Sequence, residues 1–146
     1  MKKVCVTSMF LCFLSLSSFG QEWKTNFEEA KEMASKSSEN IVLVFQGSDW
    51  CAPCIKLEKE IWSAPEFKKL SKDHFVMVKA DFPRRKTNKL SDELAVQNAK
   101  LAEKYDSQGF FPLVVLLDYK GNVLGKMGYE KISPKAYFEK LTSFEK

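Results

Sequence analysis

The residues that most often bind zinc, histidine and cysteine, are scarce in this 146-residue chain, which has one histidine, His74, and four cysteines. A structural zinc site uses four ligands drawn mostly from cysteine and histidine. Outside the first 20 residues there is only one close cysteine pair, Cys51 and Cys54. We therefore expect no bound metal and no cofactor. We also expect His74, at the head of the apolar run 74–78, to be a surface residue rather than a catalytic one.

A membrane-spanning run is also missing at the N-terminus. The uncharged stretch 4–19 is shorter than the about 20 apolar residues that a spanning helix needs, which disfavours a membrane anchor. Two lysines precede this stretch, and Ser18 and Gly20 occupy the −3 and −1 positions if cleavage falls before Gln21. This pattern predicts that residues 1–20 are a cleaved signal peptide, leaving no stable membrane insertion.

A large excess of either charge is absent. The net charge is +4, and removal of the two leader lysines lowers it to +2. Such a weak basic balance gives no reason to expect nucleic acid or an anionic membrane as a partner. Repeats, low-complexity tracts and linkers are absent as well. Residues 21–146 therefore form one domain, long enough to bury one core, and we expect a monomer.

The cysteines divide between the leader and the domain. Cys5 and Cys12 lie in the leader, and Leu11 stands where a lipoprotein signal has a small residue, so we do not expect lipidation of Cys12. Cys51 and Cys54 remain in the mature chain. A disulfide between them closes too small a loop to constrain the unfolded chain much. A purely structural role for the pair is therefore disfavoured.

The sequence Trp-Cys-Ala-Pro-Cys at 50–54 is the most informative feature of the chain. It follows the apolar run 41–45 and precedes a helical pattern, which puts Cys51 at a helix N-terminus. The partial positive charge there stabilises a thiolate, and the thiolate is the nucleophile of thiol–disulfide exchange. We therefore expect the pair to open and close a disulfide and to act on sulfur atoms of other proteins.

The order of the remaining elements predicts an α/β domain. The continuous apolar runs 41–45 and 113–117 are typical of strands buried on both faces, and the turn at 119–122 predicts a hairpin. Parallel strands joined by helices and followed by a hairpin make a central mixed β-sheet flanked by helices on both faces. The predicted elements are helix 27–37, strand 41–45, helix 52–70 interrupted at Pro65, strand 75–80, helix 94–105, strands 113–117 and 123–127, and helix 134–144.

These features resemble the thioredoxin superfamily. The matching parts are the dithiol sequence at 50–54 after a buried strand, and Phe111 and Pro112 opening the next buried strand before a glycine-containing hairpin. Residues 47–51, with the leader, are similar to small secreted thioredoxin-like proteins and to the C-terminal domain of the bacterial transmembrane disulfide reductase DsbD. The resemblance implies a thioredoxin fold over 21–146 and a periplasmic location.

The resemblance also assigns roles to individual residues. Cys51 matches the exposed nucleophile that forms a mixed disulfide with the substrate, and Cys54 matches the resolving cysteine. Pro112 matches a cis-proline that faces the dithiol, and the backbone of Phe111 would meet an extended substrate segment.

The two other residues of the 50–54 sequence are expected to shape the site. Trp50 would pack beside the dithiol and shield it, and Pro53 would stiffen the turn between the sulfurs. The Ala-Pro pair between the cysteines is close to the Gly-Pro of reducing thioredoxins, which weakly favours a reductant.

One departure from the superfamily concerns proton transfer. Thioredoxins carry a buried acid in the strand before the dithiol, but the run 41–45 has none, and Val44 stands at the matching position. Glu58, four residues after Cys54 on the same helix face, is the candidate catalytic carboxylate, and the DsbD domain has a glutamate at that spacing. The alternative is that Glu58 is an ordinary solvated charge. Asp49 is expected to point into solvent.

The second departure is a basic loop, residues 82–89, between a strand and a helix. It contains Arg84, Arg85, Lys86 and Lys89. Such a charge run is either a solvated surface or a docking site for an acidic partner.

Three functions agree with these features. The first is a periplasmic thiol–disulfide oxidoreductase that reduces disulfides of partner proteins and receives electrons from a membrane donor of the DsbD type. The second is an oxidant that uses the same dithiol to form disulfides, and the third is a redox-idle binding module on a thioredoxin scaffold. Reduction potential separates the first two, and the sequence does not give it.

Overall fold

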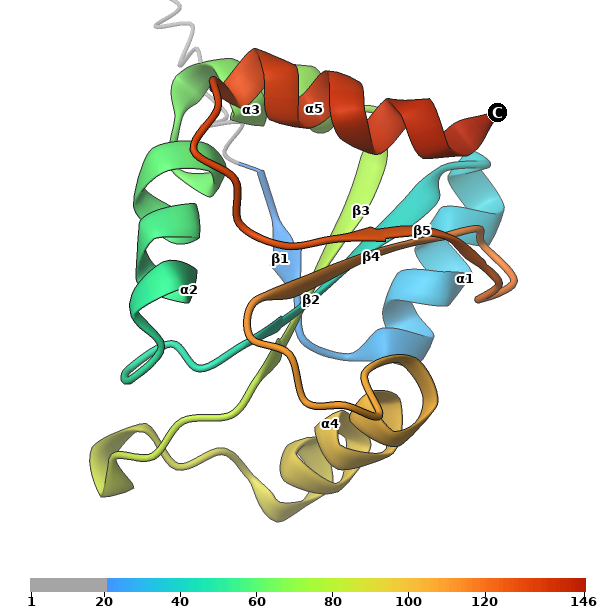
Figure 1. Cartoon of the computed structure of the whole chain (residues 1–146). Coiled ribbons are helices and arrows are strands. Elements are labelled where there is room, and N and C mark those ends of the chain that lie inside the picture. The colour runs from blue at the N-terminus through green and yellow to red at the C-terminus, as the bar shows by residue number, and fades with distance from the viewer. Residues whose placement is uncertain (1–20) are drawn as a thin grey trace, which may run out of the picture.

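The fold is built on a five-stranded sheet, seen in a computed structural model that describes residues 21–146 (Figure 1). The predicted signal peptide, residues 1–20, lies outside the described residues. In chain order the elements are β1 Trp23–Lys24, α1 Phe27–Ser37, β2 Asn40–Gln46, α2 Ala52–Leu57, the π-helical turn η1 Glu58–Trp62, α3 Pro65–Ser71, β3 Phe75–Asp81, the 3-10 turn η2 Lys86–Asn88, α4 Asp92–Tyr105, β4 Leu113–Leu117, β5 Val123–Met127, α5 Pro134–Thr142 and the 3-10 turn η3 Ser143–Glu145. No helix among the described residues is both long and apolar enough to cross a membrane.

The strand order β1-β3-β2-β4-β5 places β2 at the centre of the sheet. β2 pairs in parallel with β3 and antiparallel with β4, and β4 and β5 form the hairpin. The predicted mixed sheet is therefore confirmed. The short strand β1, which pairs in parallel with β3, has too few residues for its sequence to show a pattern, and the sequence analysis missed it.

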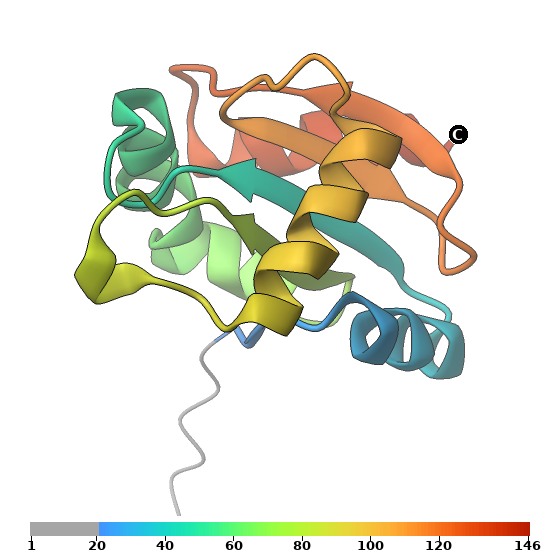
Figure 2. The same cartoon turned by 90° about the horizontal axis from the view of Figure 1, so that it is seen from below.

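Helices cover both faces of the sheet (Figures 1 and 2). The side chains of β2 alternate between the two hydrophobic cores beneath them. Ile41, Leu43 and Phe45 pack on the side of α1 and α4, whereas Val42 and Val44 pack on the side of α2, α3 and α5. All five residues have no exposed surface. Full burial of such a side chain contributes about 1.5–3 kcal/mol each, so the sheet is held by both helical layers.

The predicted helix 52–70 is interrupted, as the proline indicates, but by more than a kink. α2 passes into the π-helical turn η1, residues 63–64 are not helical, and α3 begins at Pro65. Proline suits a first helical turn because its fixed φ is helical and its missing N–H has no partner to lose there. The helix predicted from Leu94 begins earlier, at Asp92, because the Ser91 hydroxyl accepts a hydrogen bond from the backbone N–H of Leu94.

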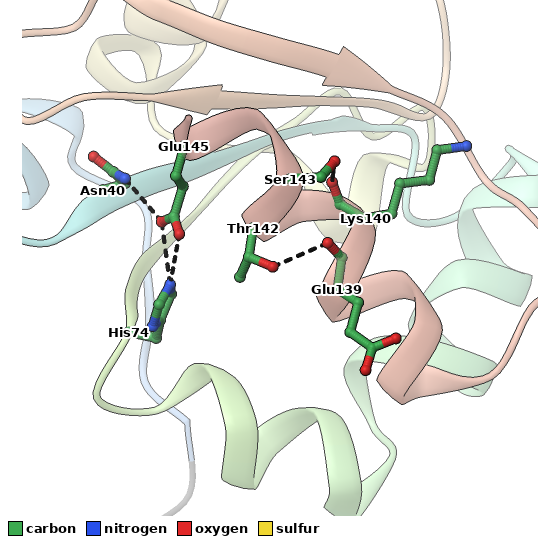
Figure 3. Close-up of polar contacts among 7 residues, drawn as sticks. All are labelled: Asn40, His74, Glu139, Lys140, Thr142, Ser143 and Glu145. Carbon is green, nitrogen blue, oxygen red and sulfur yellow. Dashed lines mark hydrogen bonds and ion pairs between the residues drawn. The ribbon is translucent and has the colours of Figure 1, made fainter.

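His74 lies at the end of the sheet opposite the dithiol. Its Nε2 is 3.0 Å from Oε2 of Glu145, whose other oxygen accepts a hydrogen bond from Asn40 (Figure 3). This contact joins η3 to the amino ends of β2 and β3, whereas Cys51 follows the carboxyl end of β2. His74, with a side chain 41% exposed, is the surface residue that the sequence predicts.

A buried aspartate organises the loop that leads into β4. Asp106 is 5% exposed, and its Oδ1 accepts a hydrogen bond from the backbone N–H of Phe110 at 2.9 Å. Oδ2 is buried and has no hydrogen-bond partner. Burial raises the pKa of Asp106 above its ordinary value, although the Phe110 N–H and the Lys126 cation act in the opposite direction. The charged form is therefore disfavoured in the folded protein.

This burial predicts a pH-dependent effect of Asp106→Asn. The folded protein binds the Asp106 proton more tightly than the unfolded chain, so this residue's contribution to stability falls as pH rises through the raised pKa. Asparagine keeps the acceptor oxygen and carries no charge. The free energy of unfolding of the variant, relative to the wild type, should therefore rise between about pH 4 and about pH 7 in urea titrations.

Asp118→Asn supplies a control of opposite sign. Burial tends to raise the pKa of Asp118, but hydrogen bonds from Asn122 and the turn amides outweigh it and lower the pKa. Relative to the wild type, this variant should lose stability as pH rises from the acid range. An Asp106→Asn effect that does not change with pH would contradict the stated role of burial.

Candidate active site

A glycine shapes the exit of the chain from β2. The indole of Trp50 covers Gly47, and a Cβ on Gly47 would lie 2.2 Å from Cε2 of that ring. The carbonyl of Gly47 also accepts a hydrogen bond from the backbone N–H of Cys51 at 2.9 Å. Only glycine leaves room for this packing, so residues 47–51 form a tight turn that leads directly into α2.

Cys51 is the N-cap residue of α2. Its backbone is extended (φ −88°, ψ 101°), and its Sγ accepts a hydrogen bond from the backbone N–H of Cys54 at 3.3 Å. Pro53 lies in the first turn of the helix. The two cysteines form a disulfide with an S–S distance of 2.07 Å. The predicted position of Cys51 at a helix N-terminus is confirmed.

The greater exposure expected of Cys51 is not seen in the disulfide form. Cys51 is 4% exposed and Cys54 is 3% exposed. Exposure therefore does not distinguish the two sulfurs, and that part of the expectation is wrong for this state. The cap hydrogen bond does distinguish them, because Cys51 Sγ faces a backbone N–H that has no partner within the helix.

Trp50 links the basic loop to the segment before β4. Its Nε1 donates a hydrogen bond to the carbonyl of Phe82 at 2.7 Å, and its ring meets the edge of Phe111 at a centroid distance of 5.6 Å. The guanidinium of Arg84 lies 3.7 Å from the ring centroid. Trp50 therefore holds the basic loop and the segment before β4 together, directly ahead of Cys51 in the chain.

Phe111 and Pro112 lie at the same end of the sheet as the dithiol, because Leu113 pairs with Phe45 near the end of β2. The Phe111–Pro112 peptide bond is cis, which confirms the expected isomer. Phe111 is half-buried and contacts Phe82 as well as Trp50. Its neighbour Phe110 is 59% exposed, which adds an apolar surface at this end of the molecule.

A polar cavity of about 460 Å³ lies beside Cys54. It is lined by Glu58, and one Glu58 carboxylate oxygen is 2.8 Å from Nζ of Lys79 on β3. Glu58 thus lines the same cavity as Cys54, and its side chain is 42% exposed. Ile55 also lines this cavity and is 49% exposed.

The sequence analysis did not identify two residues that line this cavity, Gln46 and Lys79. Val44 points into the hydrophobic core, and Gln46, two residues later on β2, lines the cavity instead. Lys79 pairs with Val44 across the sheet and reaches Glu58. A signal for Lys79 did exist, because it is the one charged residue within the apolar run 75–80.

Asp49 does not point into solvent, as the sequence analysis expected. Its carboxylate accepts hydrogen bonds from the backbone N–H groups of Arg84 and Arg85, at 2.9 and 3.0 Å, and from the side chain of Asn88. These bonds, led by the one from Arg84, lower the pKa of Asp49 below its ordinary value. Asp49 is therefore the anchor of the basic loop, and the loop is ordered beside the dithiol.

The anchor predicts a local effect of Asp49→Asn. The amide group would retain one acceptor oxygen and place a donor against the second N–H, so the loop should open more often. Hydrogen exchange of the Arg84 and Arg85 amides at neutral pH should become about tenfold faster. In the wild type, the lowered pKa should preserve the attachment until pH falls below the ordinary aspartate range.

Asp92→Asn is the matched control for this change. It removes the same charge from an exposed carboxylate that only approaches Lys89, at 3.3 Å. Exchange of the Arg84 and Arg85 amides should not change in that variant. Equal acceleration in both variants would show that net charge, and not the Asp49 hydrogen bonds, holds the loop.

Among residues 21–146 there is no group of three or more histidine, cysteine, aspartate or glutamate side chains placed to hold a metal ion. The chemical groups that meet at the candidate active site are a disulfide at a helix N-terminus, a cis-proline, an indole and a partly exposed ion pair. Together they suit the exchange of disulfides with another protein chain.

Comparisons with known proteins agree with this geometry. The family model described as Thioredoxin-like matches residues 22–118. The disulfide bond reductase DsbH of Chlamydia pneumoniae is 36% identical over 122 residues, which cover 84% of this chain and 71% of that protein.

Solved structures extend the agreement to three dimensions. A structure named DsbH oxidoreductase superposes with a TM-score of 0.78 and 35% identity, covering 86% of this chain and 84% of that chain. The oxidised C-terminal domain of DsbD from Neisseria meningitidis gives a TM-score of 0.55 at 16% identity, covering 80% and 90%, and shows likeness of fold alone. The chain therefore belongs to the thioredoxin-like family and is a thiol–disulfide oxidoreductase.

Proposed function

We propose that this oxidoreductase reduces disulfides of partner proteins in the periplasm. The observation that carries the exchange chemistry is the hydrogen bond from the Cys54 backbone N–H to Cys51 Sγ at the N-cap of α2. A donor in this position, together with the helix dipole, favours negative charge on Cys51, the form that attacks a disulfide. This contact does not set the direction of electron flow, because stabilising the reduced form makes a dithiol more oxidising. The direction rests on the named activity of the 36%-identical relative, a disulfide bond reductase.

The reaction would proceed by two exchanges. In the reduced protein, the Cys51 thiolate attacks one sulfur of the substrate disulfide, forms a mixed disulfide and releases the other substrate sulfur as a thiolate. The Cys54 thiolate then attacks Cys51, which breaks the mixed disulfide and releases the second substrate thiolate. Two electrons have passed to the substrate, and the protein is left with the Cys51–Cys54 disulfide that the structure contains.

A membrane donor of the DsbD type would return those electrons. The donor's dithiol would reduce Cys51–Cys54 by the same exchange in reverse, becoming oxidised itself. This step requires the chain to act outside the cytoplasm, which the predicted signal peptide at 1–20 would provide.

The substrate would approach between Trp50 and the cis-proline. Phe111 is half-buried against Trp50, and its backbone lies just before β4, where an extended chain could pair with it. Exposed apolar side chains nearby, Phe110 and Ile55, would cover the substrate segment. Pro53 would hold the two sulfur atoms in a fixed relative position by stiffening the first turn of α2.

Glu58 would accept the proton that leaves Cys54. Both residues line the same cavity, and the ion pair with Lys79 holds the carboxylate in place. A hydrogen bond from Ser63 reaches the other oxygen at 3.4 Å. Lys79 would thus act as a positioning residue and Glu58 as the proton acceptor.

The reduction potential of the Cys51–Cys54 pair tests the direction of electron flow. Equilibration in thiol buffers, followed by Trp50 fluorescence, should give a value near that of thioredoxin, about −270 mV. A value near −120 mV, about that of a strong oxidant, would contradict reduction and support disulfide formation instead. Cys54→Ser should trap partner proteins as mixed disulfides on Cys51, and Cys51→Ser should trap none.

The proton role of Glu58 predicts a slower second exchange in Glu58→Gln. Resolution of a preformed mixed disulfide should slow by about tenfold at neutral pH, because the thiol proton loses its acceptor. Added acetate or imidazole should restore the rate, since the cavity beside Cys54 is open to small molecules. Stopped-flow fluorescence would measure both effects.

Glu66→Gln is the matched control, because Glu66 is an exposed residue in the first turn of α3. Its rate should equal that of the wild type. A loss in Glu58→Gln that small acids and bases do not restore would mean that Glu58 has only a structural role.

A further inference from the structure

The basic loop borders a cavity with both charged and apolar walls. The cavity has a volume of about 580 Å³, and its lining includes four cationic side chains of the loop and four apolar residues. The cationic residues are Arg84, Arg85, Lys86 and Lys89, and the apolar residues are Phe82, Pro83, Leu90 and Ala95. All four cationic residues are exposed. The surface therefore offers positive charge next to apolar contact area.

The nearby acidic side chains are turned toward the backbone. Asp49 accepts from the amides of Arg84 and Arg85, and Asp81 accepts from the backbone N–H and the hydroxyl of Ser48, at 2.9 and 2.6 Å. These carboxylates still attract the loop electrostatically, and Arg85 is close enough to Asp49 to affect its pKa, which is lowered. Their oxygens, however, are occupied by N–H and O–H donors, so they do not cap the loop cations with ion pairs.

The outer cations of the loop are weakly neutralised. Lys89 approaches Asp92 at 3.3 Å, but both side chains are at least 75% exposed, and such a surface pair contributes little. Lys86 forms no ion pair with any residue of the described range 21–146. The positive charge of the loop is thus available to a partner.

The loop is continuous with the dithiol. Arg84 stacks on Trp50, and Trp50 directly precedes Cys51. Figures 1 and 2 both show the yellow-green segment that contains the loop projecting from the sheet near the start of α2. A protein segment held at Cys51 would therefore have its flanking residues within reach of the loop.

We propose that the basic loop is a docking surface for an acidic segment that flanks the target disulfide of the partner protein. The proposal rests on the proposed function for the presence of a substrate chain at Cys51. The positive charge of the loop would attract acidic residues of the partner at long range and raise the association rate. The apolar wall of the cavity would contact an apolar side chain that lies between those acidic residues. The loop thereby selects among substrates, whereas the dithiol performs the exchange.

Two matched peptides test this specificity. Each carries the same intramolecular disulfide, followed in one by a glutamate-rich flank and in the other by the same flank with glutamine. The triple variant R85Q/K86Q/K89Q retains Arg84 and hence the contact with Trp50. At low ionic strength it should reduce the acidic peptide about tenfold more slowly than the wild type, by kcat/KM, and the glutamine peptide at an unchanged rate.

Salt and a second triple variant are the controls. The difference for the acidic peptide should shrink at about 0.15 M salt, where the Debye length is about 8 Å. K36Q/K120Q/K146Q makes the same charge change at exposed lysines on α1, the β4–β5 turn and the C-terminus, and it should leave both rates unchanged. An equal loss in both triple variants, or an equal loss for both peptides, would overturn the proposal.

Failure of the proposed function would look different. If the wild type reduced neither peptide, reduction itself would be in doubt. The loop could still be tested with a form of the acidic peptide in which both peptide cysteines are replaced by serine. Its binding to the protein would be measured by fluorescence anisotropy. Loss of that binding in R85Q/K86Q/K89Q supports the proposal. Unchanged binding, together with loss of binding to anionic phosphatidylglycerol vesicles, would overturn it in favour of a membrane surface.

Discussion

Burial of β2 on both faces is the constraint on which the rest of the structure depends. Residues 41–45 have no exposed surface, so each face of the strand needs its own helical layer and each edge its own neighbouring strand. Gln46 and Gly47 are still buried, and the first exposed residue after β2 is Ser48. The end of β2 is followed at once by the turn, the dithiol and the first turn of α2. The sulfurs thus lie just beyond a fully buried strand, between the end of β2 and the first turn of α2.

The carboxylates around this edge mostly accept hydrogen bonds from backbone N–H groups rather than form ion pairs. Asp49 and Asp81 join the basic loop to the turn before Cys51, and Asp106 holds the N–H of Phe110 ahead of the cis-proline. A charged acceptor makes a stronger hydrogen bond with an N–H than a neutral one does, and the lowered pKa of Asp49 keeps that carboxylate charged against the basic loop. One consequence is electrostatic, because the acids face inward while the arginine and lysine side chains of the loop face outward. The same hydrogen bonds therefore have two effects: they hold the basic loop in place, and they keep Asp49 and Asp81 from forming ion pairs with its cationic side chains.

The sequence predicted what local pattern determines. Continuous apolar runs identified the central strands, and the spacing of Cys51 and Cys54 before a helical pattern identified the site. Prediction failed where a contact joins distant segments. Glu58 and Lys79 are 21 residues apart, and Asp49 and Arg84 are 35 apart, so neither pairing has a local signal and Asp49 was wrongly expected in solvent. The equal burial of the two sulfurs also depends on packing by other parts of the chain, and no sequence pattern reports it.

The ion pair beside Cys54 offers a different solution from a buried acid in the central strand. An unpaired carboxylate at Val44 would face the hydrophobic core, where burial without a partner costs several kcal/mol. Glu58 avoids most of that cost, because its side chain is 42% exposed and one oxygen is paired with Lys79. Residues 41–45 remain wholly apolar, and the polar groups gather in the cavity lined from the end of β2, β3, α2 and η1. In the proposed mechanism the Cys54 sulfur would exchange its proton through this cavity, while the opposite packing of β2 stays apolar.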